Sequence, residues 1–207
     1  KHEGVALFMP AYLSESDDLA VKIVSVFPRN LDRGLPTIFA LVMVLEADTG
    51  RPLAVMDGTY LTALRTGAAT AVAAKYLARP DSSTVGILGC GVQGRSNLEA
   101  LNVLFPVQRV MAYDLDTGAA GRYAQEMEER LGLEVQVAET PRQAVSGCDI
   151  VVTAGPILRK PHATIKAGWL DEGAFASLVD FDSYWHPAAM HEADKFCTDD
   201  ILSLIHI

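Results

Sequence analysis

The stretch Thr84–Ser96, TVGILGCGVQGRS, constrains the fold more than any other part of the chain. An apolar, β-branched run leads into Gly89, Gly91 and Gly94, which have the spacing G-x-G-x-x-G, and a helix-forming pattern follows. A strand that turns tightly into a helix in this way is typical of a doubly wound α/β fold that binds a dinucleotide. We therefore predict an α/β protein with a Rossmann-type parallel sheet.

Each glycine of this loop has its own reason to lack a side chain. Gly89 permits the tight turn, Gly91 lets the backbone approach a pyrophosphate, and Gly94 lets the helix pack on the strand. The N–H groups at the start of the helix face the phosphates, with Val92 and Gln93 on the same rim. We predict that these five residues bind the cofactor. A glycine-rich turn without a ligand is the alternative.

The end of the next predicted strand indicates which dinucleotide is bound. Asp114 closes the run RVMAYD, twenty residues after Gly94. A carboxylate there accepts hydrogen bonds from the ribose hydroxyls of the adenosine and repels a 2′-phosphate. The predicted cofactor is therefore NAD rather than NADP.

Strands and helices alternate after Pro80, which predicts a parallel sheet with right-handed crossovers. The expected strands are residues 84–89, 109–114, 133–138, 148–155, 173–181 and 194–200, and the expected helices are residues 92–104, 117–132 and 140–147.

The part before Pro80 has a different texture. Strand-like runs at residues 21–28 and 37–47 are followed by a hairpin turn at 48–50 and a further strand at 52–57. An alanine-rich segment without proline, residues 59–78, predicts a helix.

These patterns divide the chain into a β-rich domain over residues 1–78 and a Rossmann domain over residues 79–201. The final LSLIHI, residues 202–207, resembles a translated sequencing adapter, and we interpret it as a non-native tail.

Composition narrows the class of partner. The net charge of −9 argues against nucleic acid and against an anionic membrane surface, and no apolar run is long enough to span a bilayer. Cys90, Cys148 and Cys197 form no CxxC pair, which suits small buried side chains in a reducing cytoplasm. His186 and His191 have no partner motif, so no metal site is predicted. A small metabolite is the expected partner.

Three stretches resemble the ornithine cyclodeaminase/μ-crystallin family: VKIVSVFPRNLDRGLPT, LEADTGRPLAVMDGTYLTALRTGAATAVAAKYLA and VGILGCGVQGRS. The resemblance runs in order from near the start to about Ile201. It implies a β-rich domain that binds substrate and builds a homodimer, followed by a domain that holds the nicotinamide. The family's opening and closing segments are missing, so we expect a chain truncated at both ends.

The resemblance also implies roles for residues of the first domain. Lys22 matches the family's substrate-binding lysine, Arg65 matches an arginine that contacts the substrate carboxylate beside the nicotinamide, and Thr37 matches a cofactor contact. Arginine grips a carboxylate with a planar fork and lysine adds a point charge, as an α-amino acid requires. A surface ion pair for Arg65 and a solubility charge for Lys22 are the alternatives. Further predicted cofactor contacts are Thr66, Thr153, Val179, Asp180 and Phe181.

The segment after the fifth Rossmann strand contains the expected catalytic residue. Asp182 takes the place of the family's catalytic aspartate, whereas Asp180 and Ser177 stand where the family usually has glycine and asparagine. The usual Pro-Gly-Lys-x-Glu is replaced by residues 183–187, SYWHP. Two carboxylates so close together should raise the pKa of one of them, which could then carry a proton near neutral pH.

Other readings of this segment stay open. Asp180 could instead be a turn residue. Tyr184 and Trp185 could line a substrate site or cover the core.

Three functions follow from the resemblance. The first is conversion of L-ornithine, or a related amino acid, to a cyclic amino acid with loss of ammonia, in which NAD takes a hydride from the α-carbon and returns it. The second is a net oxidoreductase, either a ketimine reductase or an amino-acid dehydrogenase. The third is a non-catalytic binding protein of the crystallin type.

Overall fold

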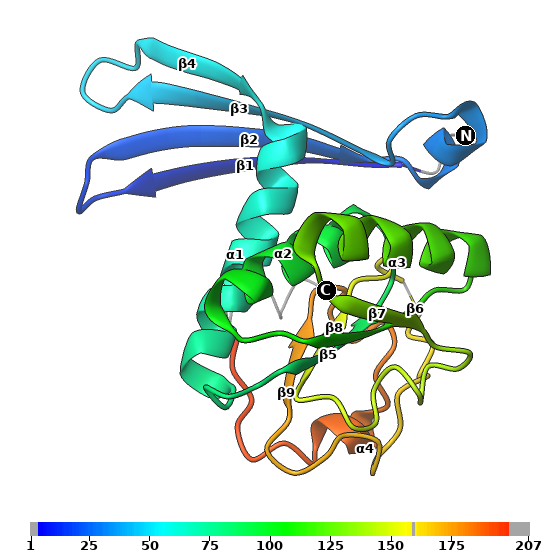
Figure 1. Cartoon of the computed structure of the whole chain (residues 1–207). Helices are drawn as coiled ribbons and strands as arrows, with labels where there is room; N and C mark the ends of the chain where they lie inside the picture. Colours follow the sequence, from blue (N-terminus) through cyan, green and yellow to red (C-terminus); the bar gives the residue numbers. More distant parts are fainter. Residues whose placement is uncertain (1–3, 159, 199–207) are drawn as a thin grey trace. The chain divides into compact units, whose positions relative to one another are not determined.

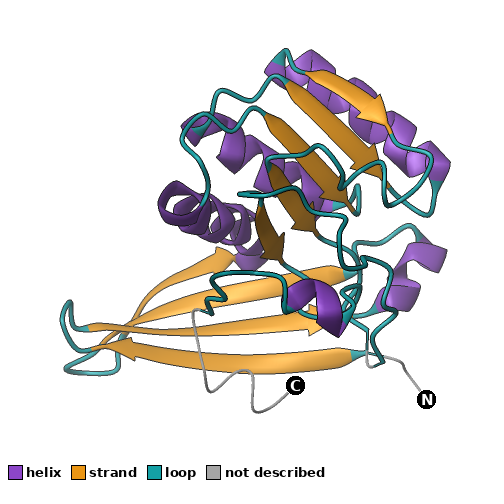
Figure 2. Ribbon diagram, turned by 90° about the horizontal axis from the view of Figure 1, so that it is seen from below, coloured by secondary structure: helices purple, strands orange, loops and turns teal. Residues whose placement is uncertain are grey.

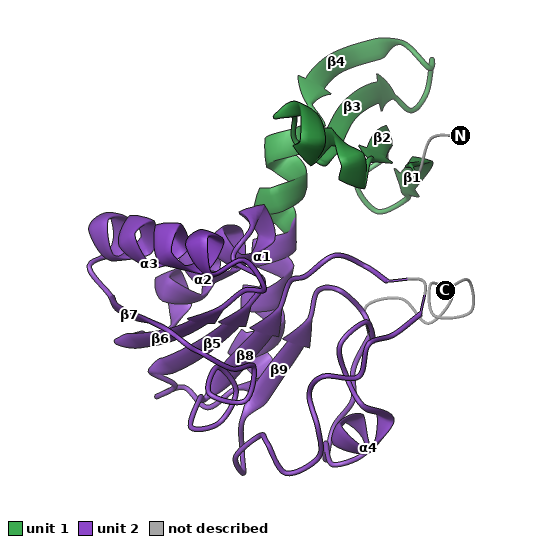
Figure 3. Ribbon diagram, turned by 90° about the vertical axis from the view of Figure 1, so that its right-hand side faces the viewer, with its two compact units in different colours: residues 1–65 green, residues 66–207 purple. Residues whose placement is uncertain are grey.

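The structure, a computed structural model, describes residues 4–158 and 160–198. It has two compact units that divide between Arg65 and Thr66, inside helix α1 (Gly58–Leu77) (Figure 3). The sequence places the domain boundary at the end of this helix instead, between residues 78 and 79. The two descriptions differ because the second half of α1 packs with the second unit, where Ala74 is fully buried in the core.

The first unit contains a four-stranded antiparallel sheet in the order β1-β2-β3-β4 (Figure 2). Its strands are β1 (Val5–Leu13), β2 (Asp18–Val26), β3 (Ile38–Glu46) and β4 (Pro52–Asp57), and the 3-10 helix η1 (Pro28–Arg33) joins β2 to β3. The hairpin of β3 and β4 turns at Gly50, whose φ of +71° is easy only for glycine. The β-rich character of this region and the hairpin are as predicted.

Strand β1 was not predicted. Its sequence, VALFMPAYL, contains Pro10, which has no N–H to give to a sheet. The structure tolerates Pro10, paired with Val21, because β1 is an edge strand with a neighbour on one side only.

The second unit is a Rossmann-type sheet of five parallel strands in the order β7-β6-β5-β8-β9. The strands are β5 (Thr84–Leu88), β6 (Arg109–Tyr113), β7 (Glu134–Val137), β8 (Ile150–Thr153) and β9 (Phe175–Leu178). Helix α2 (Val92–Leu104) links β5 to β6, and α3 (Thr117–Leu131) links β6 to β7. From β5 the next strands, β6 and β7, are added on one side of the sheet, and β8 and β9 are added on the other. The point between β5 and β8 is a topological switch point, and ligands of such sheets bind there, at the carboxyl ends of the strands.

Helices α2 and α3 cover one face of this sheet (Figure 1). The core on that side includes Ile87, Leu98 and Tyr123, all fully buried. A second core on the opposite face includes Val151 and the side chain of Trp185. It also contains Ala189 of the short helix α4 (Pro187–Met190). The central strands β5 and β8 are therefore buried on both sides, as their continuous apolar sequences require.

Three sequence-based expectations were wrong. Residues 141–147 form a series of turns rather than a helix. The described part of the last expected strand, residues 194–198, is not a strand, because no neighbouring strand pairs with it. Cys197 is exposed, whereas Cys90 and Cys148 are buried as expected, because the segment around Cys197 packs into neither core. Residues 202–207 lie outside the described residues.

No helix within residues 4–158 and 160–198 combines the length and the apolar character needed to cross a membrane.

Candidate active site

The glycine loop of the second unit leaves room where a cofactor is expected. A Cβ built on Gly91 would meet no atom of the described residues within 4 Å, so no contact among them explains a glycine there. Helix α2 begins at the next residue, and its N-cap Gly91 offers no side-chain hydrogen bond to the free N–H groups. Backbone donors and open space together suit a pyrophosphate.

Gly89, in contrast, is needed for the packing of the loop. Its φ is +103°, and a Cβ would lie 2.6 Å from the carbonyl carbon of Ala154. The amide of Ala154 in turn donates to the carbonyl of Leu88 at 2.7 Å. The glycine loop after β5 therefore lies directly against the loop after β8.

Asp114 lies at the end of β6 and holds the glycine loop. Its Oδ2 accepts a hydrogen bond from the amide of Cys90 at 2.8 Å, and its Oδ1 accepts one from the amide of Asp116 at 2.9 Å. A carboxylate oxygen has more than one lone pair, so both oxygens can also accept from ribose hydroxyls.

The sequence reasoning overlooked Arg95. Its guanidinium donates to the carbonyl of Gly91 at 3.1 Å and to the carboxylate of Glu126 at 2.8 Å, and it also donates to the carbonyl of Cys90. The signal for it was an arginine directly after the third glycine. Arg95 stabilises the carbonyl side of the loop and leaves the N–H groups of α2 available.

The carboxyl ends of β8 and β9 bring together four other predicted cofactor contacts of the second unit, Thr153, Val179, Asp180 and Phe181. Thr153 ends β8, and its carbonyl accepts a hydrogen bond from the amide of Val179 at 3.0 Å. Asp180 is only 1% exposed, and it accepts hydrogen bonds from Thr153 Oγ1 at 2.7 Å and from the amide of Gly155 at 3.0 Å. Phe181 has a φ of +59°, which is strained for a bulky side chain.

This turn separates the two carboxylates that the sequence places side by side. Asp182 is exposed, whereas Asp180 is buried. Burial is the main cause that raises the pKa of Asp180 to about 6, against the hydrogen bonds from Thr153 and Gly155, and the charge of Asp182 contributes last. One carboxyl pKa is raised, as predicted, but desolvation outweighs the charge pair.

In the first unit, the positive charges of Lys22 and Arg65 lie close enough to interact. Lys22 lies in the middle of β2, half-buried, and Arg65 is exposed on α1. Burial lowers the pKa of Lys22, and the nearby positive charge of Arg65 lowers it further. Two cations so placed favour an anion, such as a carboxylate. Thr37 lies just before β3, where its carbonyl accepts from the amide of Phe27 at 2.8 Å.

The remaining predicted contact, Thr66, opens the second unit and is half-buried.

The surroundings of Lys22 in the sheet are apolar. Its cross-strand partners are Met9 in β1 and Val42 in β3, and Val42 pairs in turn with Met56 in β4. Because side chains alternate along a strand, these residues share one face of the sheet. The cationic head of Lys22 therefore rises from an apolar row.

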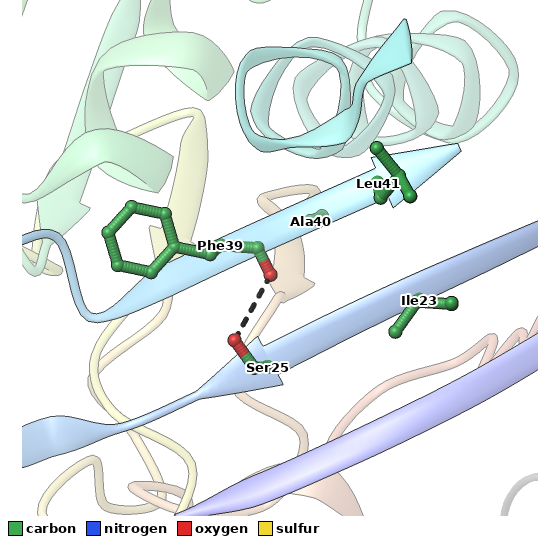
Figure 4. Close-up of a pocket in the computed structure, with 5 residues that line it drawn as sticks. All are labelled: Ile23, Ser25, Phe39, Ala40 and Leu41. Carbon is green, nitrogen blue, oxygen red and sulfur yellow. Dashed lines mark hydrogen bonds between the residues drawn. The ribbon is translucent and has the colours of Figure 1, made fainter. Parts of the chain in front are cut away.

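A shallow hollow on the first unit is lined by no charged side chain. It is lined by Ile23, Ser25, Phe39, Ala40 and Leu41 (Figure 4). The hydroxyl of Ser25 donates to the carbonyl of Phe39 at 3.4 Å, and none of the five side chains is charged. Ile23 follows Lys22 in β2, so the two side chains point to opposite faces.

The structure decides between the two readings of Trp185. Its side chain is 2% exposed in the second core, and its Nε1 donates to Thr153 Oγ1 at 3.0 Å. Tyr184 is half-buried above Gly155. Ser177 bonds to Thr70 of α1 through their hydroxyls, 2.9 Å apart. In the described ranges, no cluster of three or more His, Cys, Asp or Glu residues could hold a metal ion.

Comparison with known families gives a match over almost the whole chain. The model of the ornithine cyclodeaminase/mu-crystallin family matches residues 1–200. An alanine dehydrogenase of Archaeoglobus fulgidus is 45% identical over 174 residues, which cover 84% of this chain and 52% of the relative. An ornithine cyclodeaminase of Agrobacterium fabrum is 38% identical over 163 residues, 79% of this chain and 45% of that protein. The chain therefore spans about half the length of these relatives.

A solved structure agrees with the fold. The Delta(1)-pyrroline-2-carboxylate reductase of Thermococcus litoralis, in complex with NADH and L-proline, has a TM-score of 0.80 and 43% sequence identity. The match covers 84% of this chain and 53% of that one.

Proposed function

The chain belongs to the ornithine cyclodeaminase/mu-crystallin family, and from that premise we propose that it is an NAD-dependent oxidoreductase. Its proposed substrates are small α-amino acids and the corresponding α-imino acids. The observation that carries the proposal is the glycine loop, where Gly91 faces open space at the start of α2 and Asp114, directly after β6, accepts a hydrogen bond from the amide of Cys90. These residues fit NAD, and a carboxylate at 114 disfavours the 2′-phosphate of NADP.

The residues of the loop would divide the work of binding. The N–H groups of Val92, Gln93 and Gly94 would hold the pyrophosphate, and Asp114 would accept the ribose hydroxyls. Thr153 ends β8, and Val179 and Phe181 follow the end of β9. These residues would line the nicotinamide side of the crevice. Bound NADH supplies a hydride for the α-carbon of the substrate.

The first unit would bind the substrate carboxylate. Arg65 offers a bidentate fork and Lys22 a second positive charge, which would orient the α-carbon for reaction. The apolar row of Met9, Val42 and Met56 beside Lys22 supports a substrate with a small, uncharged side chain. A second ammonium group, as in L-ornithine, would gain nothing from these neighbours.

Asp182 is the proposed proton carrier. It is exposed at the turn after β9, next to the buried Asp180. Its carboxyl group could hold a proton and give it to the substrate nitrogen as the C=N bond is reduced, or take one in the reverse reaction. Replacing Asp182 with Asn should leave NADH binding intact and remove most turnover. An active Asn variant would exclude Asp182 from this role.

Support for a net redox reaction comes from the relatives. Alanine dehydrogenase and Delta(1)-pyrroline-2-carboxylate reductase are both named for oxidation or reduction at a carbon next to a carboxylate. A redox-neutral cyclodeaminase is the second candidate, favoured by the 38% identity to the Agrobacterium ornithine cyclodeaminase. The homodimer implied by the resemblance stays a prediction.

Labelled cofactor tests the proposal. The full-length gene product would be given NADH deuterated at the transferred position with either pyruvate and ammonium or Delta(1)-pyrroline-2-carboxylate. We expect one deuterium at the α-carbon of the alanine or proline that forms, detected by mass spectrometry. NADH binding without transfer of label to any imino acid would favour a non-catalytic binding protein instead.

A further inference from the structure

The segment Asp180–His186, DFDSYWH, follows β9, and the proposed function uses only two of its residues. Three of its side chains are not exposed to solvent. Asp180, Ser183 and Trp185 are buried, and each makes a specific hydrogen bond to another part of the second unit. These three buried side chains therefore form one connected structure with the neighbouring part of the second unit.

Asp180 is the centre of this structure. One carboxylate oxygen accepts from the hydroxyl of Thr153 at 2.7 Å, and the other accepts from the amide of Gly155 at 3.0 Å. The hydroxyl of Thr153 is itself oriented by the indole N–H of Trp185, which donates to it at 3.0 Å. In this chain of hydrogen bonds the Trp185 N–H donates to the Thr153 oxygen, and the Thr153 O–H donates to the Asp180 carboxylate, so each group has a partner that suits it.

The rest of the segment binds the loop that follows β8. Ser183 Oγ accepts from the amide of Leu158 at 2.9 Å, and the Tyr184 hydroxyl donates to the carbonyl of Pro156 at 2.9 Å. The ring of Tyr184 lies so close to Gly155 that a Cβ there would be 2.6 Å from it. The loop after β8, residues 154–158, is thus held by the segment after β9 at Gly155, Pro156 and Leu158.

The loop held in this way borders the glycine loop. A Cβ on Gly89 would lie 2.9 Å from the amide nitrogen of Gly155, the same amide that donates to Asp180. A shift of the loop after β8 would therefore change the wall against which the glycine loop packs. The carboxylate of Asp180 is well placed to prevent that shift.

We infer that Asp180 is a positioning residue for the cofactor: through Gly155 and Thr153 it holds the loop after β8 against the glycine loop. The inference rests on the proposed binding of NAD at this edge of the sheet. Asp180 does not need to touch the cofactor or the substrate to act in this way.

The chemistry of the carboxylate explains why an amide cannot replace it. Asp180 faces two donors, the Thr153 hydroxyl and the Gly155 amide. Asparagine accepts with one oxygen only and presents an NH₂ group to the other donor. In Asp180→Asn either the Gly155 amide loses its acceptor, or Thr153 receives two donors and its own hydroxyl hydrogen loses its acceptor. A buried donor without a partner is unfavourable, so the loop should move.

Two measurements on the full-length gene product test the inference. Hydrogen exchange without cofactor reports whether the 154–165 peptide is held, and titration with NADH, followed by fluorescence, reports binding. In Asp180→Asn we expect faster exchange confined to this peptide and the turn after β9, with the dissociation constant for NADH raised roughly tenfold. Trp185→Phe keeps most of the ring but removes the donor to Thr153, and it should give a smaller change in the same direction.

Asp149→Asn is the matched control. Asp149 also accepts hydrogen bonds, from the amides of Ser83 and Thr84 and from the Thr84 hydroxyl. It lies directly before β8, at the amino-terminal ends of the strands, whereas Asp180 lies at their carboxyl ends. This variant should lower overall stability without changing NADH affinity or the exchange of residues 154–165. The control separates a local positioning effect from general destabilisation.

Two results would overturn the inference. Unchanged exchange of residues 154–165 in Asp180→Asn and Trp185→Phe would show that the bonds do not hold the loop. Faster exchange with unchanged NADH affinity would show that the held loop does not position the cofactor. Failure of the unaltered protein to bind NADH would refute the proposed function itself, and the exchange comparison would still decide whether Asp180 holds the loop.

Discussion

Replacement of Asp180 with Asn should change how the stability of the second unit depends on pH. Burial raises the pKa of Asp180 in the folded protein to about 6 from its ordinary value of 3.8. The folded state therefore binds this proton more tightly than the unfolded state. The stabilisation that the protonated Asp180 carboxyl group contributes is complete below pH 3.8 and is lost as the pH rises through 6. The reason is that burial of the ionised form is unfavourable.

The size of the effect follows from the two pKa values. The full shift corresponds to about 3 kcal/mol, and between pH 5 and pH 7.5 the linkage relation gives about 1 kcal/mol. Asparagine does not titrate, so it lacks this term. The destabilisation caused by Asp180→Asn should therefore be smaller at pH 7.5 than at pH 5, by about 1 kcal/mol.

Urea unfolding followed by tryptophan fluorescence measures this difference. Both tryptophans of the chain, Trp169 and Trp185, lie in the second unit, so the signal reports on the unit that contains Asp180. Asp149→Asn serves as the control. Burial opposes the ionisation of Asp149, but hydrogen bonds from Ser83, Thr84 and Arg79 outweigh it and lower the pKa to about 2.

The sign for Asp149 is opposite. Its contribution to stability is present above pH 3.8 and is lost as the pH falls through 2, so it is constant between pH 5 and pH 7.5. The effect of Asp149→Asn should be equal at the two pH values. If Asp180→Asn also gave equal destabilisation at pH 5 and pH 7.5, the burial of an ionisable Asp180 would be refuted.

Three further predictions concern binding. Gly91→Ala should weaken NADH binding at least tenfold and leave the melting temperature unchanged, because the new Cβ meets only open space. Gly94→Ala should instead lower the melting temperature, because its Cβ would lie 2.3 Å from a backbone carbonyl oxygen. Asp114→Ser should reduce the preference for NADH over NADPH, measured as the ratio of the two dissociation constants by titration with each coenzyme. An unchanged ratio would contradict the assignment of Asp114 to the ribose. Arg65→Ala and Lys22→Met should raise the KM for the amino or imino acid at least tenfold at unchanged NADH affinity; an unchanged KM would remove both residues from carboxylate binding.

Local patterns made much of the second unit predictable from sequence. The glycine loop, α2, α3 and Asp114 follow one another within a short stretch, and each has its own signature. The strand β1 escaped prediction because Pro10 argues against a strand unless the strand is known to lie at an edge. Edge position is a property of the whole sheet and is not visible in a short window.

The environment of Asp180 could not be predicted for a similar reason. Asp180 and Asp182 look equivalent in sequence, and the expected cause of a raised pKa was their mutual repulsion. The structure buries one and exposes the other, because Phe181 turns the chain between them and Trp185 closes the core beneath Thr153. Burial of this kind depends on contacts between residues more than twenty positions apart, which spacing alone does not reveal.

The central claim is a net transfer of hydride to an imino acid, and the stoichiometry of the cofactor tests it most directly. The full-length gene product would be incubated with NADH and Delta(1)-pyrroline-2-carboxylate, and in parallel with NAD⁺ and L-ornithine, while nicotinamide absorbance, proline and ammonia are followed together. The account predicts that each proline formed in the first reaction consumes one NADH. Release of ammonia and formation of proline from L-ornithine, with no net change in nicotinamide, would contradict it and identify a cyclodeaminase.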